Sequence, residues 1–111
     1  MDISHRDENG ITIVTIEGRL DAAQAPAASK AIEKILKGNV SRILFDLGGL
    51  EYLSSGGLRV ILGAAKEMKR KEGKIALCAL NEYVKEIFEV SGFDSLIPIS
   101  ETVEDGIQRI S

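Results

Sequence analysis

The stretch Tyr52-Leu53-Ser54-Ser55-Gly56-Gly57-Leu58-Arg59-Val60 joins a hydrophobic strand pattern to a hydrophobic helix pattern. Serine at such a boundary is a favoured helix N-cap. The first turn of the helix that follows offers free N–H groups and the positive end of the helix dipole to an anion. A serine in this stretch can therefore be a cap, a nucleophile, or a site where phosphate is added.

Helix and strand patterns alternate on both sides of this junction. Such alternation is typical of βαβ units, which build a largely parallel sheet with right-handed crossovers. An α/β domain is therefore predicted. The first expected element is a hairpin that turns at Asn9-Gly10 and whose second strand ends at Gly18. It is followed by a helix over 25–37, a strand over 43–47 buried on both faces, and a helix from Leu58 that ends at Gly73. The remaining elements are a strand over 75–80, a helix after Asn81, an edge strand over 96–99 with Pro98, and a final helix after Ser100.

Size and composition narrow the class of protein. The 111 residues suffice for one compact domain, and with no Trp and 5% aromatic residues the core must be aliphatic. A net charge of −3 argues against nucleic acid as the main partner, because phosphate binding needs a basic surface. Neither a signal peptide nor a run of ~20 apolar residues is apparent, so the cytoplasm is the expected compartment and no membrane contact is expected. Cys78, the single cysteine, lies in an apolar run and is predicted to be a buried structural thiol.

Two catalytic interpretations of the junction fail on residue type. A nucleophile elbow needs Gly-x-Ser-x-Gly, but Leu53 stands where its first glycine belongs. The single histidine, His5, lies in the first strand, far from the junction in sequence. A phosphate-binding loop needs Lys after its second glycine, and Ala64 follows Gly63.

Metal ligands are sparse, since the chain has neither a histidine cluster nor a cysteine pair. Asp21 and Asp46 are expected near each other at strand ends. There they can hold Mg²⁺ weakly or accept hydrogen bonds from loop N–H groups, and the second role is favoured. No metal and no cofactor are expected.

Modification of a serine fits the junction better than catalysis. Arg59 lies four residues after Ser55, so both side chains fall on one face of a helix, where Arg59 can steady a phosphate. The glycines at 56 and 57 keep the first turn bare, which lets another protein approach the hydroxyl. The same Ser-Ser-Gly-Gly run is also ordinary cap chemistry, and Arg59 is equally well explained as a solvated surface residue.

Several motifs together resemble the STAS domain family, named for sulfate transporters and anti-sigma factor antagonists. The chain looks most like the stand-alone bacterial anti-sigma factor antagonists, and the resemblance covers essentially the whole chain. The motifs are Gly18-Arg19-Leu20-Asp21, Ile43-Leu44-Phe45-Asp46-Leu47, the run from Ser54 to Leu62, and Ala79-Leu80-Asn81 followed by Val84, Phe88 and Ser91-Gly92.

This resemblance implies a single STAS domain over residues 1–111. Its fold is α/β, with a mixed sheet of about four to five strands and about four helices packed mainly on one side. The implied phosphoacceptor is Ser55, with Ser54 as the alternative; Ser54 stands where many members have Asp, and Gly56 where many have Ser or Thr. The implied partner-binding surface consists of Arg19, Asp21, Ser54, Ser55, Gly56, Gly57 and Arg59.

The resemblance also implies partner switching by a protein that is not an enzyme. The unmodified protein binds an anti-sigma factor that is also a serine kinase, which frees the sigma factor. Phosphorylation of Ser55 ends this binding, and a PP2C-type phosphatase resets the protein. A monomer or weak dimer is expected. Two alternatives are a STAS scaffold or sensor that is not phosphorylated, and a weak nucleotide-binding protein that uses the helix start and Asp21.

Overall fold

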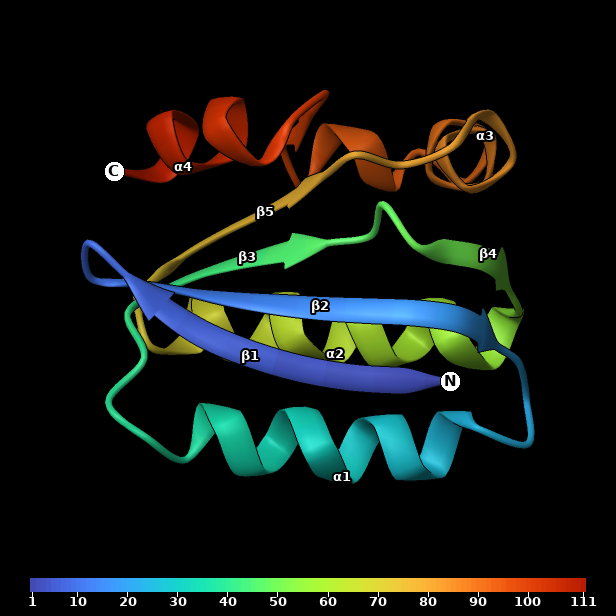
Figure 1. Ribbon diagram of the computed structural model, residues 1–111, viewed down its shortest axis with the longest axis horizontal. Helices are drawn as coiled ribbons and strands as arrows, with labels where there is room; N and C mark the ends of the chain where they lie inside the picture. The colour runs from blue at the N-terminus through green and yellow to red at the C-terminus, as the bar shows by residue number, and fades with distance from the viewer.

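The computed structural model describes the whole chain, residues 1–111, as helices packed on a six-stranded mixed sheet (Figure 1). The elements in chain order are β1 (Asp2–Glu8), β2 (Ile11–Leu20), α1 (Ala25–Leu36), β3 (Arg42–Asp46), β4 (Leu50–Leu53), α2 (Ser55–Arg70), β5 (Lys74–Cys78), α3 (Glu82–Ser91), the short 3-10 helix η1 (Phe93–Ser95), β6 (Ile99–Ser100) and α4 (Val103–Ile110). The strand order is β1-β2-β3-β5-β6, and β4 pairs with β2 outside this path. Only β1 and β2 are antiparallel; all other pairs are parallel. The predicted α/β class is confirmed.

The N-terminal hairpin forms where the Asn-Gly pair predicts it. Asn9 has φ 53° and Gly10 has φ 79°, the left-handed conformations that a two-residue hairpin turn requires. The turn sets the register in which Glu8 pairs with Ile11 and Asp2 with Glu17. The strand β2 that it starts pairs with three other strands, β1, β3 and β4.

The sheet separates two hydrophobic clusters. Alternation along β3 sends Ile43 and Phe45 into the larger cluster, with α1, α2 and α3, and Leu44 into the smaller one, with α4. All three side chains are fully buried, and β3 is parallel to both of its neighbours, as the continuous apolar run predicts. Three of the four helices thus share one core, in agreement with helices packed mainly on one side. Gly106 lets α4 approach the opposite face, since a Cβ there would lie 2.7 Å from Leu44 Cδ1.

Two sequence-based expectations for β2 and its partner are wrong. Gly18 does not end the strand: it has φ 91°, the register shifts between Gly18 and Arg19, and β2 continues to Leu20. The shift lets β2 leave β3 and pair with Leu50–Leu53, a segment expected to be only a connection. This additional strand, β4, is why the sheet has six strands rather than four to five. Its sequence, Leu50-Glu51-Tyr52-Leu53, does not alternate strictly between apolar and polar residues, so it lacks the pattern that predicts a strand.

The C-terminal elements also differ in extent from their prediction. The strand expected over 96–99 is reduced to Ile99–Ser100, and η1 precedes it. Pro98 has no N–H to donate, but its carbonyl accepts a hydrogen bond from the Leu77 N–H at 2.9 Å. β6 is an edge strand, as Pro98 predicts. The final helix is capped by Thr102, whose hydroxyl accepts a hydrogen bond from the Asp105 N–H at 3.1 Å.

Cys78 is a buried thiol, as predicted. Its side chain is inaccessible to solvent and its Sγ lies 3.6 Å from the Phe45 carbonyl oxygen, to which it donates. Burial disfavours the thiolate, and the negative charges of Asp46 and Glu104 add to this effect. Together they raise the pKa of Cys78 from 9.0 to about 12.

This pKa predicts how stability depends on pH in alkaline solution. The unfolded thiol releases its proton from pH 9.0 upward, while the folded thiol keeps it until about pH 12. Since the folded state then holds the additional proton, the free energy of unfolding falls as pH rises through this window, by up to about 1.4 kcal/mol per pH unit. Urea unfolding of the wild type and of Cys78→Ala at several pH values above 9.0 measures the effect. The wild type should lose stability more steeply; equal slopes would contradict the prediction.

Candidate functional site: the serine junction at the start of α2

Ser54 holds the start of α2 to the end of β2. It has extended backbone angles, φ −86° and ψ 172°, and its Oγ accepts a hydrogen bond from the Gly57 N–H at 3.1 Å. The Ser54 hydroxyl donates to the Leu20 carbonyl at 3.2 Å, and the Ser54 N–H donates to the same oxygen at 3.0 Å. Ser54 is therefore the N-cap, and its hydroxyl is engaged both as donor and as acceptor.

Ser55 is the first residue of α2 and is exposed. Its hydroxyl takes no part in the hydrogen bonds that fix the junction, all of which are made by Ser54. Its position at the first turn places it beside the positive end of the helix dipole. Of the two serines, Ser55 is thus the one whose oxygen is available to another molecule.

The structure supplies no histidine base for a nucleophilic serine at the junction. His5 pairs with Val14 in the middle of the hairpin, and β2 runs on to Leu20 before the junction is reached. At about 3.3 Å per strand residue, these six residues separate the imidazole from the junction by roughly 20 Å. The arrangement does not support acyl-transfer chemistry.

Asp21 and Asp46 both accept hydrogen bonds from loop N–H groups. A carboxylate oxygen of Asp21 accepts from the Gln24 N–H at 3.0 Å, just before α1. Asp46 accepts from the Gly48 N–H at 3.1 Å, just after β3. Of the two roles that the sequence allowed them, the structure gives both residues the role of fixing a loop.

The two glycines of the junction have different roles. A Cβ on Gly57 would lie 2.7 Å from both the carbonyl oxygen and the Cγ of Leu20, and 2.9 Å from Leu53 Cδ1. Gly57 is accordingly buried, and only a glycine lets the first turn of α2 approach β2 so closely. A Cβ on Gly56 would meet nothing nearer than the Ala25 Cβ at 3.5 Å. The bare surface expected at both glycines therefore exists at Gly56, whereas Gly57 faces the interior.

A stack of three side chains lies beside the junction; we call Arg19, Tyr52 and Tyr83 the Arg–Tyr–Tyr stack. Arg19 and Tyr83 are exposed, and Tyr52 between them is half-buried. The Arg19 guanidinium carbon lies 4.3 Å from the centroid of the Tyr52 ring. The rings of Tyr52 and Tyr83 stack with centroids 6.1 Å apart and an interplanar angle of 16°. The three come from β2, β4 and the first turn of α3, and Arg19 and Tyr52 are paired in the β2–β4 register. The sequence placed Arg19 at the site but missed both tyrosines, because their contact depends on the unrecognised strand β4.

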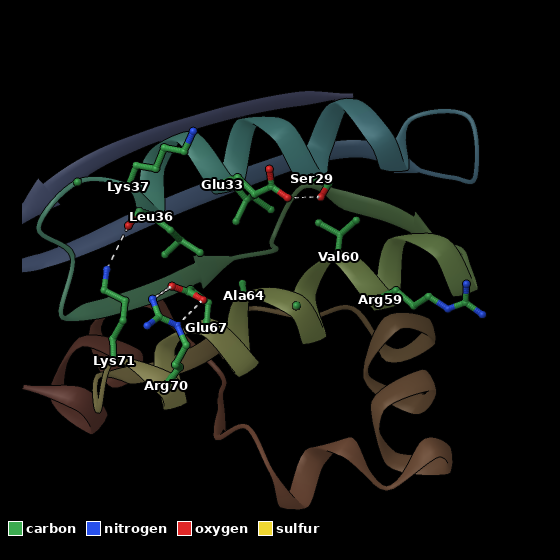
Figure 2. Close-up of a pocket in the computed structure, with 13 residues that line it drawn as sticks. Ser29, Glu33, Leu36, Lys37, Arg59, Val60, Ala64, Glu67, Arg70 and Lys71 are labelled. Carbon is green, nitrogen blue, oxygen red and sulfur yellow. Dashed lines mark hydrogen bonds and ion pairs between the residues drawn. The ribbon is translucent and has the colours of Figure 1, made fainter.

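Arg59 lies one turn after Ser55 on α2 and is exposed. The two ion pairs of the structure join Arg6 to Glu8 and Arg70 to Glu67, so Arg59 has no carboxylate partner. Figure 2 shows its side chain extending away from the body of the protein, at the end of α2 that carries the junction. Its charge is therefore available to a group bound near Ser55.

A groove of about 680 Å³ runs between α1 and α2 and begins beside Arg59 (Figure 2). Several of its polar groups are bonded within the protein: Ser29 donates to Glu33 at 3.4 Å, and Arg70 Nε donates to Glu67 at 3.1 Å. Arg70 thereby lowers the pKa of the Glu67 carboxyl. The Lys71 ammonium donates to the Leu36 carbonyl at 3.1 Å. These bonds leave Lys37 and Arg59 as the charged lining side chains without a partner, and of the two Arg59 lies at the end of α2 that carries the junction.

Exchanging each glycine for alanine separates their roles. Gly57→Ala should lower the free energy of unfolding by about 1–3 kcal/mol, because the methyl group overlaps Leu20. Gly56→Ala should leave stability unchanged or raise it by up to about 1 kcal/mol, since alanine favours the helix and has room. Urea unfolding of both variants beside the wild type measures this. Equal effects of the two substitutions would contradict the close approach at Gly57.

Sequence comparison places the chain among bacterial regulators. The family model described as the STAS domain matches residues 2–106. The chain is 35% identical over 96 residues to BtrV of Bordetella bronchiseptica, covering 86% of this chain and 83% of BtrV. It is 33% identical over 101 residues to the anti-sigma-B factor antagonist of Listeria monocytogenes, covering 89% of this chain and 86% of that relative.

Solved structures agree with this fold. An anti-sigma factor antagonist from Mycobacterium paratuberculosis superposes with a TM-score of 0.90 at 22% identity, covering 98% of this chain and 92% of that one. The Bacillus cell fate determinant SpoIIAA in its phosphorylated form superposes with a TM-score of 0.77 at 20% identity, over 99% of this chain and 100% of SpoIIAA. The unphosphorylated form of SpoIIAA gives a TM-score of 0.74 at 19% identity, over 98% of this chain and 97% of SpoIIAA.

The fold and the match over residues 2–106 define a STAS domain. This chain belongs to the STAS domain family and is similar to bacterial anti-sigma factor antagonists. None of the helices combines the length and the apolar character that crossing a membrane would require.

Proposed function

We propose that this protein is an anti-sigma factor antagonist whose binding is switched off by phosphorylation of Ser55. Unmodified, it binds an anti-sigma factor that is also a serine kinase, and so frees the sigma factor. The observation that carries the proposal is that the two serines of the junction have different roles. Ser54 holds the helix start, while the exposed hydroxyl of Ser55 is available for modification.

In the proposed phosphorylation this chain supplies only the attacking hydroxyl, and the kinase supplies ATP and the catalytic base. Ser55 Oγ attacks the γ-phosphorus of ATP in the kinase site, the bond from that phosphorus to the β,γ-bridging oxygen breaks, and ADP leaves. The hydroxyl proton passes to a base of the kinase. A PP2C-type phosphatase reverses the modification by hydrolysis. In this cycle the protein is a ligand and a substrate, and it needs no catalytic residues of its own.

The local structure can accept the phosphate without unfolding. A phosphoserine carries about −1.5 to −2 charges, and its position at the first turn of α2 is favoured by the helix dipole. Arg59, exposed and without a carboxylate partner, lies one turn away to pair with it. The cost of the new charge therefore falls on the complex, where a surface shaped for a neutral hydroxyl would have to bury it.

Two relatives support the proposal by their descriptions. The Listeria monocytogenes protein is an anti-sigma-B factor antagonist. SpoIIAA has been solved both phosphorylated and unphosphorylated, so a protein of this fold carries such a modification.

The decisive experiment is phosphorylation by the cognate anti-sigma factor kinase with ATP, followed by mass spectrometry of the junction peptide. Wild type and Ser54→Ala should be labelled, and Ser55→Ala should not. Ser54→Ala should also lower the free energy of unfolding by about 1 kcal/mol through loss of the cap, so it is assayed well below its unfolding temperature.

Binding measured by calorimetry completes the test. Ser55→Asp should bind the kinase at least about tenfold more weakly than wild type, and Ser55→Ala should bind about as well as wild type. Labelling of Ser55→Ala would move the acceptor to another residue. Two results together would favour a scaffold or sensor that is not phosphorylated: a wild type that the kinase does not label, and a Ser55→Asp variant that binds the kinase as tightly as wild type.

The Arg–Tyr–Tyr stack is expected to contribute to the same binding surface. Arg and Tyr are the side chains most often found at the energetic centre of interfaces, and stacking holds these three in place before binding. Tyr83→Ala should weaken kinase binding by about 1–2 kcal/mol, whereas Tyr83→Phe, which keeps the stacked ring, should bind like wild type within about threefold. Calorimetry with the unphosphorylated proteins measures both. Equal binding of all three proteins would exclude the stack from the interface.

A further inference from the structure

A second groove, which we call the basic groove, lies toward the other end of α2 from the serine junction. Its walls are the last turns of α2, the start of β5, the segment 93–98 and the end of α4, and its volume is about 660 Å³. β6 pairs only with Leu77 and Cys78 of β5, so the first residues of β5 lie open at the sheet edge. Lys66 is eleven residues beyond Ser55, or roughly 16 Å along the helix. An occupant of this groove can therefore bind while the Ser55 hydroxyl stays free.

The rim of the basic groove carries charge of one sign. Lys66, Lys69, Lys74 and Arg109 line it, and no acidic residue does. None of the four belongs to an ion pair within the protein. In a chain of net charge −3, this is a local concentration of uncompensated positive charge.

The floor of the basic groove is apolar. Seven of its thirteen lining residues are hydrophobic, among them Leu62, Ile75 and Ile97. Leu96, at its edge, is 70% exposed. An apolar floor with a basic rim fits an amphipathic helix that carries acidic residues beside an exposed apolar side chain.

The chain itself presents such a helix. The exposed residues of α3 include Glu82, Glu86 and Glu89 and no basic residue, since its one lysine, Lys85, is half-buried. Val90, on the same outer face, is 81% exposed. Val90 of α3 and Leu96 of the basic groove are the two most exposed large hydrophobic side chains of the structure.

We propose that the occupant of the basic groove is a second copy of this chain, which docks the outer face of its α3. Val90 of one copy covers the apolar floor beside Leu96 of the other, while Glu86 and Glu89 pair with Lys66 and Lys69. Each copy carries both surfaces, so the contact can form twice in a two-fold dimer or repeat head to tail. Because the contact buries few apolar side chains and is largely electrostatic, the association is weak and falls with salt.

Charge reversal tests this docking with the protein alone. One double variant, Lys66→Glu with Lys69→Glu, makes the groove acidic; the other, Glu86→Lys with Glu89→Lys, makes α3 basic. By sedimentation at about 50 mM salt, each variant alone should self-associate at least about tenfold more weakly than wild type. An equimolar mixture should associate again, since each variant then offers the charge that the other lacks.

A matched control tests whether the effects of charge reversal come from net charge alone rather than from the basic groove. Lys30→Glu with Lys34→Glu places the same charge change on exposed residues of α1, away from both surfaces. This control should self-associate like wild type. Mixed with the Glu86→Lys, Glu89→Lys protein, it should associate more weakly than the groove variant does, since only one of the two possible contacts, its own acidic α3 in the basic groove of the other protein, is then attractive. A wild type that stays monomeric up to about 1 mM, where even a millimolar Kd is detected, would overturn the proposal. So would a mixture that fails to associate, or a control that pairs as well as the groove variant.

Discussion

The serine junction depends on the close approach of the first turn of α2 to the end of β2. Ser54 holds the Leu20 carbonyl with two donors, and Gly57 leaves out the side chain that would overlap the same residue. The junction can therefore be short, and Ser55 is presented in a defined position. A helix start anchored at its cap needs no further contact from the next residue, which is why the Ser55 hydroxyl is available.

The same end of the protein also carries the Arg–Tyr–Tyr stack. The register of β2 shifts between Gly18 and Arg19, and the strand then pairs with β4. This pairing brings Arg19 beside Tyr52, and the Tyr83 ring stacks on Tyr52. The strand ends of a largely parallel sheet meet at one edge, and residues far apart in sequence gather there. A binding surface built on rigid elements loses little side-chain freedom when a partner binds.

The two ends of α2 carry different chemistry. Its first turn offers a neutral hydroxyl that a phosphate would convert into a strong negative charge. Toward its last turns it lines an uncompensated basic groove, whose counterpart is the acidic outer face of α3. A switch at one end and a weak self-contact at the other can operate on the same helix, because Ser55 and Lys66 are separated by about three turns.

The sequence alone was sufficient for the elements whose signals are local. Asn9-Gly10 specified the hairpin, the continuous apolar run predicted a strand buried on both faces, and the resemblance carried by the run from Ser54 to Leu62 identified the family. Helix periodicity, turn chemistry and cap residues act over a few neighbours, so they can be read from one chain. The burial of Cys78 followed in the same way from its apolar surroundings.

Only the tertiary structure decided which serine is the cap and which is free. Both serines have the same chemistry in sequence, and the distinction comes from a carbonyl 34 residues away, that of Leu20. The same holds for β4 and for the stacking of Tyr52 on Arg19, which exist because β2 shifts register and takes a new partner. Contacts between distant segments depend on how the sheet is assembled. The sequence therefore determined the α/β fold class and placed the candidate site at the start of α2, and the packing of α2 against β2 determined the role of each residue in it.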